Sequence, residues 1–447
     1  MTDAVSPVET YFRDLAALLD RSLGGGERYT CRLDAESSDF VRFNRGKVRQ
    51  PGSVTQGYLR LSLIDGNRHA DQSLTVSGDL ASDREAVFAA LRGLRATLAG
   101  LPDDPHLAYA TDVSSSRVVR HGSLPAAEAI VEAVLDAAHG LDLVGIYAGG
   151  PVYRGFANSL GQRNWHEVAS FSLQWSLYHR ADKAVKSAYG GFDWDGAVLA
   201  EKMAGARERL GLLARPSKAL EPGRYRAYLA PSAMEEIAGM LCWGGFSGRA
   251  LQTRQSCLFR LNEGSARLDP SVSFSEKTSE GIAPAFQDDG FARPNEVPLV
   301  DDGRMVGSLV SPRTGREFTL AHNGANASET PESLEMQGGT LAADDALDLL
   351  DTGLYIGNLH YLNFSDRPAC RLTGMTRFAS FWVESGRIVA PVDVMRFDDT
   401  VFRLLGSELA GLTTERELLV SSDTYHQRDV ASMRLPGAVV REMAFTL

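Results

Sequence analysis

The chain has 447 residues, of which 44% are hydrophobic and 23% are charged. At roughly 150 residues per domain, this length corresponds to two or three domains, which can bury sizeable cores without a disulfide or a structural metal. The 46 basic and 57 acidic residues give a net charge of −11, which argues against general binding to nucleic acid or to anionic membranes.

The cysteines and the first residues of the chain indicate a cellular compartment. The four cysteines are Cys31, Cys242, Cys257 and Cys370, and no two of them form a C-x-x-C pair. Isolated cysteines are typical of reduced thiols in a cytosolic protein. The first fifteen residues are charged and contain no apolar run, and no stretch approaches the roughly 18 apolar residues of a membrane span. We therefore expect a cytoplasmic protein with no membrane or nucleic-acid partner.

The first half of the chain mixes helical and strand-like patterns. A helix is predicted from Pro7 and a second over 83–99, because apolar residues recur there at helical spacing. Strands are predicted between residues 28 and 75, with a tight turn at Asp65-Gly66-Asn67. A polar connection over 102–122 leads to a third helix over 123–139, which Ser123 is expected to cap. Strands between 143 and 179 and a helix over 194–214 follow.

The second half is richer in turns. Glu221-Pro222-Gly223 marks a boundary, and a helix is predicted over 231–243. Short apolar runs separated by turns such as Asp289-Gly290 and Ser385-Gly386 follow and indicate strands. We therefore predict an α+β protein: an N-terminal mixed α/β lobe of two units (1–110 and 111–220), followed by a large β-rich, barrel-like C-terminal domain (221–447).

Common catalytic motifs are missing from the sequence. It contains no G-x-x-x-x-G-K-[ST] phosphate loop, no G-x-S-x-G nucleophile elbow and no G-x-G-x-x-G dinucleotide fingerprint. The residues that could bind a metal ion are scattered along the sequence. The adjacent Glu235 and Glu236 could act as a metal ligand and a general base, or they could simply favour the dipole of the predicted helix. His322, His360 and His426 lie in or beside strand-like runs and could converge across a sheet.

Several segments taken together resemble one family, the TldD/PmbA proteins, which are metallopeptidase-like and were once described as modulators of DNA gyrase. Asn158-Ser159-Leu160-Gly161 matches the family's N-S-x-G turn, and Asp288-Asp289-Gly290 resembles its D-D/E-G motif. The step Gly353-Leu354-Tyr355, the strand pair at 299–309 and the strand pair at 381–392 also resemble family motifs. Each motif alone is weak, but their order and spacing along residues 35–440 are specific.

The resemblance implies a dimeric, two-lobed protein with a β-rich C-terminal domain. In the family's metal-bearing branch, a helix carries H-E-x-x-x-H, in which two histidines hold zinc and the glutamate acts as general base. A cysteine near the C-terminus completes that site. The zinc would lower the pKa of a bound water, and the glutamate would take its proton.

This chain departs from the zinc-binding pattern. The resemblance places Glu235 at the first histidine, Glu236 at the glutamate and Met240 at the second histidine, and no cysteine follows Cys370. A thioether is a poor zinc ligand. The chain therefore resembles the zinc-less PmbA-type branch. The resemblance then implies no metal bound by this chain, a zinc-bearing TldD-type partner chain, and unfolded peptides as substrates, which can bind as added β-strands.

The leading hypothesis is thus a zinc-less subunit that binds unstructured peptides while a partner supplies the metal chemistry. Its candidate residues are Glu236 as a catalytic base and Trp243, Arg249 and Arg254 as peptide-binding groups, although the two arginines also fit solvated surface charge. Two alternatives remain open at this point. One is a self-sufficient metallohydrolase with a relocated site at His322, His360 and His426. The other is a non-catalytic homodimeric scaffold that binds peptides.

Overall fold

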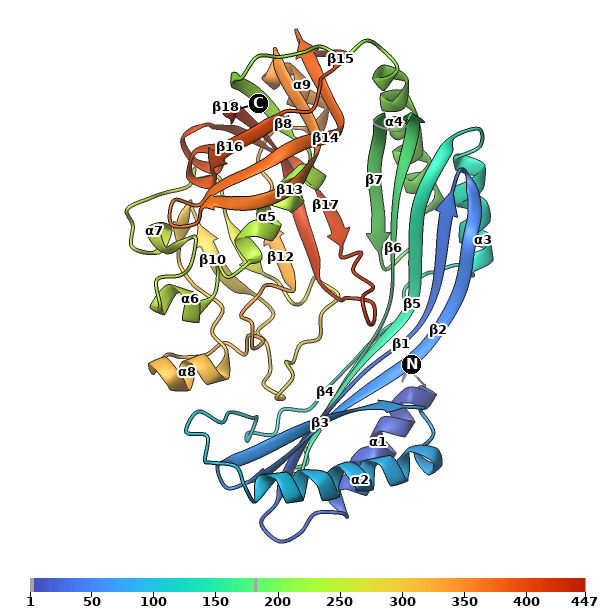
Figure 1. Cartoon of the computed structure of the whole chain (residues 1–447), viewed down its shortest axis with the longest axis vertical. Helices are drawn as coiled ribbons and strands as arrows, with labels where there is room; N and C mark the ends of the chain where they lie inside the picture. The colour runs from blue at the N-terminus through green and yellow to red at the C-terminus, as the bar shows by residue number, and fades with distance from the viewer. Residues whose placement is uncertain (1–3, 181–182, 447) are drawn as a thin grey trace.

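The computed structural model describes residues 4–180 and 183–446, which form two lobes built on separate sheets (Figure 1). This arrangement confirms the predicted α+β class and the large β-rich C-terminal domain. Within these residues, no helix is long and apolar enough to cross a bilayer. All four cysteines are buried and unpaired.

The N-terminal lobe is a long twisted sheet whose strands follow the order β3-β2-β1-β5-β6-β4, with β7 also paired to β6. Its strands are β1 (Arg28–Asn44), β2 (Lys47–Asp65), β3 (Arg68–Val76), β4 (Ser116–Arg120), β5 (Asp142–Asn158), β6 (Arg163–Arg180) and β7 (Lys183–Gly191). The predicted turn joins β2 to β3, where Asp65 pairs with Arg68 and Gly66 adopts a φ of 60°. Since β1 pairs with β5, the two predicted N-terminal units share this one sheet.

Four helices cover this sheet within the described residues: α1 (Pro7–Asp20), α2 (Leu80–Leu98), α3 (Ala127–Ala137) and α4 (Gly196–Leu213). The first begins at a serine cap, because the Ser6 side chain accepts a hydrogen bond from the Glu9 amide at 3.3 Å. The third is shorter than predicted. Ser123 donates to Asp193 at 2.9 Å instead of capping the helix, so α3 begins four residues later. The predicted connection over 102–122 also contains β4, which pairs in parallel with β6.

The C-terminal lobe contains the second sheet. Its strands are β8 (Gly223–Leu229), β9 (Phe274–Glu276), β10 (Val297–Asp301), β11 (Arg304–Met305), β12 (Ser333–Met336), β13 (Gly353–Asp366), β14 (Arg371–Glu384), β15 (Arg387–Pro391), β16 (Arg396–Thr400), β17 (Leu409–Val420) and β18 (Ser432–Phe445). Because β8 pairs with both β13 and β18, the path β18-β16-β14-β13-β8 closes into a ring. The helical segments are α5 (Pro231–Cys242), α6 (Gly248–Gln252), α7 (Phe259–Asn262), α8 (Pro312–Phe318), α9 (Ala346–Leu350) and the single turns η1 (Ala343–Asp345) and η2 (Arg403–Ser407).

The two lobes share a hydrophobic core. One buried cluster joins Phe171 and Tyr189 of the N-terminal sheet to Tyr228, Tyr355 and Phe381 of the C-terminal sheet. Burial of apolar side chains contributes about 25 cal/mol for each Å² removed from water. The shared cluster therefore holds β7 and α4 against the C-terminal lobe, and this contact positions the cleft described below.

Candidate functional site

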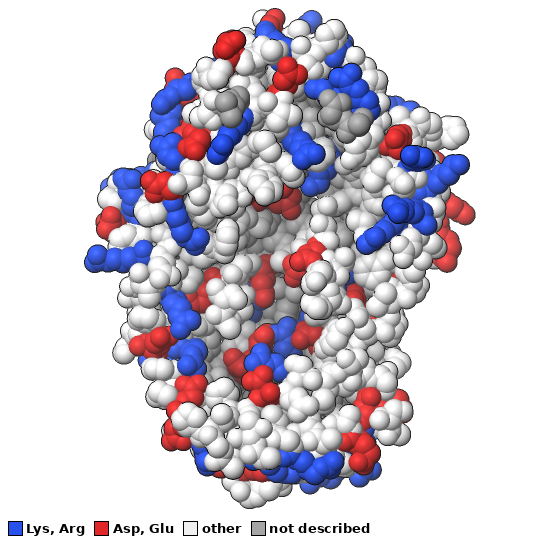
Figure 2. Space-filling view, viewed as in Figure 1, with Lys and Arg blue, Asp and Glu red and all other residues white. Residues whose placement is uncertain are grey.

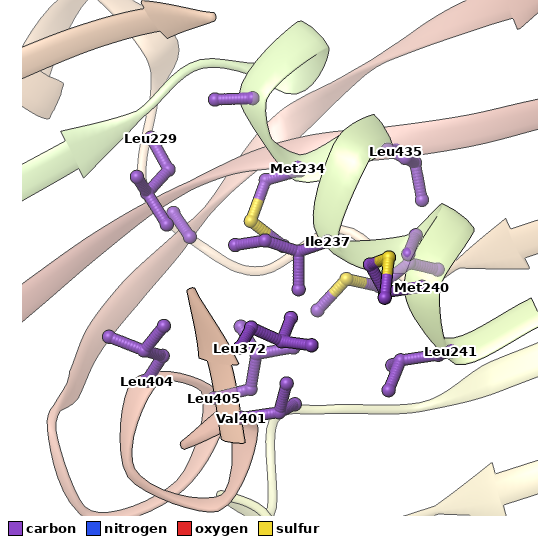
Figure 3. Packing of buried hydrophobic residues seen from close by; sticks show 14 of the residues in the cluster. Leu229, Met234, Ile237, Met240, Leu241, Leu372, Val401, Leu404, Leu405 and Leu435 are labelled. Carbon is purple, nitrogen blue, oxygen red and sulfur yellow. The ribbon is translucent and has the colours of Figure 1, made fainter. Parts of the chain in front are cut away.

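Helix α5 carries the positions that the family resemblance singles out. It follows directly after β8 and begins with Pro231 in its first turn, a position where the missing amide hydrogen of proline costs nothing. One side of the helix is apolar and enters the core of the C-terminal lobe. The buried residues on this side include Met234, Ile237, Met240 and Leu241, which pack with Leu372, Val401, Leu404, Leu405 and Leu435 (Figure 3).

Glu235 and Glu236 are half-buried and carry the charge of this helix. Burial raises the pKa of Glu235 to about 7, and the neighbouring Glu236 adds to the rise. Lys186 of β7 acts in the opposite direction and lowers this pKa, whereas Glu417 of β17 raises it. Glu235 is therefore within electrostatic reach of both lobes. A carboxyl group with a pKa near neutrality is suited to proton transfer.

The residues of α5 do not fit a zinc site of the family type. Met240, at the position of the second histidine, is 8% exposed and points into the hydrophobic core (Figure 3). Glu235, at the position of the first histidine, is within reach of Lys186 and Glu417 instead. Across the described ranges, no group of three or more His, Cys, Asp or Glu side chains is placed to hold a metal ion. The donor set of this helix thus disagrees with the H-E-x-x-x-H chemistry.

The space in front of α5 is a charged cleft between the lobes. The face of the molecule is hollowed there, and both acidic and basic side chains lie inside the hollow (Figure 2). A pocket of about 560 Å³ occupies part of this cleft and is lined by α4, β7, the start of α5, β13 and β17. Residues from both lobes therefore line a single pocket.

The structure places the three candidate histidines in different surroundings. His322 is exposed, and its ring lies edge-on to Phe291 at 5.0 Å. His426 packs its ring against Tyr425, and its carbonyl group accepts a hydrogen bond from Gln56. Burial lowers the pKa of His360, and Arg377 adds to this effect, whereas Glu236 opposes it. His360 and Glu236 are therefore brought into electrostatic contact, and His322 and His426 are not part of that group.

The predicted peptide-binding residues all follow α5 in the chain. Trp243 is 62% exposed and is flanked by Phe364 and by the Arg367 guanidinium, which lies 5.8 Å from the Trp243 ring centre. Arg249 forms an ion pair with Glu317 at 2.9 Å. Arg254 lines a separate pocket of about 570 Å³.

Sequence reasoning missed the residues that line the interlobe pocket. Among them are Arg209 of α4, Tyr228 of β8, and Tyr355 and Asn358 of β13. Only Tyr355 carried a signal, as part of the Gly353-Leu354-Tyr355 step. Arg209 resembles any surface arginine of a helix, and only the packing of α4 against the C-terminal lobe brings it to Tyr355.

Comparisons with known proteins agree with this geometry. With its two lobes and its β-rich C-terminal domain, the chain is metallopeptidase-like in its fold. Residues 222–447, about half of the chain, match the PmbA/TldA metallopeptidase C-terminal domain, so the chain belongs to the PmbA/TldD family. No curated protein matches the chain significantly.

Solved structures share the fold over nearly the whole length. A proposed modulator of a DNA gyrase from Thermotoga maritima matches with a TM-score of 0.77 at 14% identity, covering 98% of this chain and 100% of the other. TldE from Thermococcus kodakarensis matches with a TM-score of 0.77 at 13% identity and the same coverage. A proposed modulator of DNA gyrase from Bacteroides thetaiotaomicron matches with a TM-score of 0.76 at 14% identity, covering 99% and 100%. At these identities, the likeness concerns the fold.

Proposed function

We propose that this chain is the zinc-less subunit of a TldD/PmbA-type peptidase, which binds unstructured peptides while a partner chain supplies the metal chemistry. The observation that carries the proposal is the position of Met240. Its side chain occupies the hydrophobic core at the place where the family's zinc-bearing branch requires a histidine. A buried thioether in an apolar cluster is unsuited to zinc, so α5 supports a binding role.

The interlobe cleft supports peptide binding. Among the described strands, β7 pairs only with β6 and so has one free edge. Four consecutive residues of β7, from Val185 to Ala188, line the pocket in the cleft. An extended peptide can pair with such an edge through its main chain, with little demand on its sequence. Trp243, Arg249 and Arg254 remain proposed contacts for the peptide, and Glu236 a proposed base toward its scissile region.

Cleavage assays test this proposal. The chain should be purified without a metal-affinity tag, assayed for zinc by elemental analysis, and incubated with an unfolded peptide. We expect zinc well below one ion per chain and no cleavage products by mass spectrometry. Addition of a zinc-bearing family member should then produce cleavage above that of the partner alone, and chelation of the partner's zinc should abolish it.

The same assay separates the alternatives. Full peptidase activity of this chain after all partner has been removed would contradict the proposed subunit role. In that case, loss of both zinc and activity in His360→Ala or His322→Ala would favour a relocated metal site. Stable peptide binding without cleavage, even after the partner has been added, would instead favour a homodimeric scaffold.

A further inference from the structure

The interlobe pocket combines charges from two lobes with polar groups that lack partners. Most of its acidic groups are already engaged. Glu417 forms an ion pair with Lys202, and Glu415 accepts a hydrogen bond from the Ala343 amide at 2.9 Å. Arg416 is likewise held by Glu335 at 2.9 Å. These groups therefore have little capacity left for a ligand.

Arg209 is different, because it has no carboxylate partner in the described part of the chain. One terminal nitrogen of its guanidinium donates to the Tyr355 hydroxyl at 2.8 Å, and its Nε is buried without any hydrogen-bond partner. An unpaired buried donor on a charged group is costly. Lys186 lines the same pocket and also makes no ion pair with any residue that the structure describes. The pocket thus contains two cations without a salt-bridge partner among the described residues.

Two further polar side chains of the lining are nine-tenths buried and unpartnered. Tyr228 is 8% exposed and Asn358 is 5% exposed. Neither the Tyr228 hydroxyl nor the Asn358 carboxamide makes a hydrogen bond within residues 4–180 and 183–446, although both line the pocket. Their polar atoms nevertheless stay accessible from the pocket. A ligand there can therefore accept a hydrogen bond from the Tyr228 hydroxyl or from the Asn358 carboxamide.

The start of α5 also favours an anion in this pocket. Ala230, Pro231 and Ser232 line the pocket, and Ala230 offers no side chain to cap the helix. The first amide groups of a helix and its dipole favour a negative charge. This feature alone would not define a site, but here it faces the same pocket as Arg209 and Lys186.

We propose that this pocket binds a carboxylate, namely the C-terminal carboxylate of a peptide that lies in the interlobe cleft. A planar guanidinium such as that of Arg209 matches a carboxylate with two parallel hydrogen bonds. Glu201, Glu415 and Glu417 also line the pocket, so a singly charged carboxylate suits it better than a doubly charged phosphate. The residues of β7 in the lining allow the main chain of the same peptide to continue along the free strand edge. This inference rests on the proposed peptide-binding function.

Calorimetric titration of the full-length chain tests the proposal. One short unstructured peptide is prepared in two forms, as the free acid and as the C-terminal amide. The free acid should bind at least about tenfold more tightly, because a charge-assisted hydrogen-bond pair is lost in the amide. Acetate is titrated separately to distinguish a peptide terminus from any small carboxylate.

Three variants test whether the preference for the free acid arises in this pocket. Arg209→Gln should bind both peptide forms with nearly equal affinity. Arg207→Gln is the matched control, because Arg207 lies on the same helix but is exposed and outside the pocket lining. It should keep the full preference for the free acid. Tyr228→Phe removes a hydroxyl without a partner, so the fold should be unaffected while the free acid binds about threefold more weakly.

The outcomes separate this proposal from the proposed function. Equal affinity of the wild-type chain for the acid and the amide would overturn the carboxylate site while leaving peptide binding supported. An unchanged preference in Arg209→Gln would overturn it as well. Failure of both peptide forms to bind would overturn the carboxylate site and the proposed function together. Binding of acetate alone, with the same dependence on Arg209, would overturn the assignment to a peptide terminus.

Discussion

The main-chain amide of Arg428 donates a hydrogen bond to Glu36 Oε2 at 3.3 Å, although 392 residues separate the two in sequence. Arg428 lies in the loop between β17 and β18, whereas Glu36 lies on β1 of the N-terminal sheet. The guanidinium also donates to the Gly150 and Ser170 carbonyl groups at 2.8 and 2.7 Å. Burial lowers the pKa of Arg428 to about 10, and the negative charge of Glu36 limits this shift. The charged side chain of Arg428, which belongs to the C-terminal lobe, is thus buried against the N-terminal sheet.

Removal of this charge should destabilise the protein. Arg428→Met removes the buried guanidinium and leaves the Gly150 and Ser170 carbonyl groups without these donors, so we expect the free energy of unfolding to fall by about 3 kcal/mol. Chemical denaturation measures this change. Arg92→Met, at an exposed position of α2, is the control and should alter stability by less than about 0.5 kcal/mol. Equal stability of the two variants would show that Arg428 does not join the lobes.

Glu235 should make the stability of the protein depend on pH. Its pKa is raised from 4.5 to about 7 in the folded state, mainly by burial. The folded state therefore holds a proton that the unfolded state has lost between these two values, so stability falls as the pH rises from about 4.5 through 7. Glu235→Gln should be more stable than the wild type at pH 8, by about 1–3 kcal/mol, and similar at pH 4.

Thermal unfolding across this pH range checks the Glu235 prediction. The exposed Glu208→Gln on α4 is the matched control and should leave the pH profile of the wild type unchanged. A profile of Glu235→Gln that coincides with the wild type between pH 4 and 8 would contradict a raised pKa at Glu235.

Restoring the family motif should not restore zinc binding. The double variant Glu235→His with Met240→His recreates H-E-x-x-x-H, but position 240 faces the core of the C-terminal lobe. We expect no zinc above the wild-type level by elemental analysis and a loss of about 2–4 kcal/mol of stability, because an imidazole replaces a packed side chain. Met240→Leu should cost less than about 1.5 kcal/mol. One zinc ion per chain in the double variant would show that α5 can turn toward the cleft.

Trp243 should matter for binding and not for folding. Its side chain is 62% exposed, so Trp243→Ala should change the free energy of unfolding by less than about 1 kcal/mol. The same variant should weaken peptide binding several-fold, because large aromatic side chains dominate contact energies. Calorimetry and denaturation measure the two effects separately. A strong loss of stability with unchanged peptide affinity would assign Trp243 to packing with Phe364 and Arg367 instead.

Features that depend on neighbouring residues could be predicted from the sequence. The apolar spacing of α2 and α5, the Asp65-Gly66-Asn67 turn and the α+β class follow from local periodicity and turn chemistry. Ordered motifs from Asn158 to Tyr355 indicated the family, and the Glu235 and Met240 positions already indicated a degraded zinc motif. Each of these inferences needs only residues that are close together in the chain or their order along it.

Contacts between residues far apart in the chain could not be predicted, because they form only when the sheets assemble and the two lobes pack. The sequence predicts Ser123 as a helix cap, but its side chain donates a hydrogen bond to Asp193 instead. Residues 116–120 form strand β4 through their pairing with β6. The pairing of Arg209 with Tyr355 joins residues 146 positions apart, and no local pattern distinguishes it from a surface arginine. The pocket arises from such contacts, because burial and desolvation depend on how two lobes pack and not on the order of residues in either one.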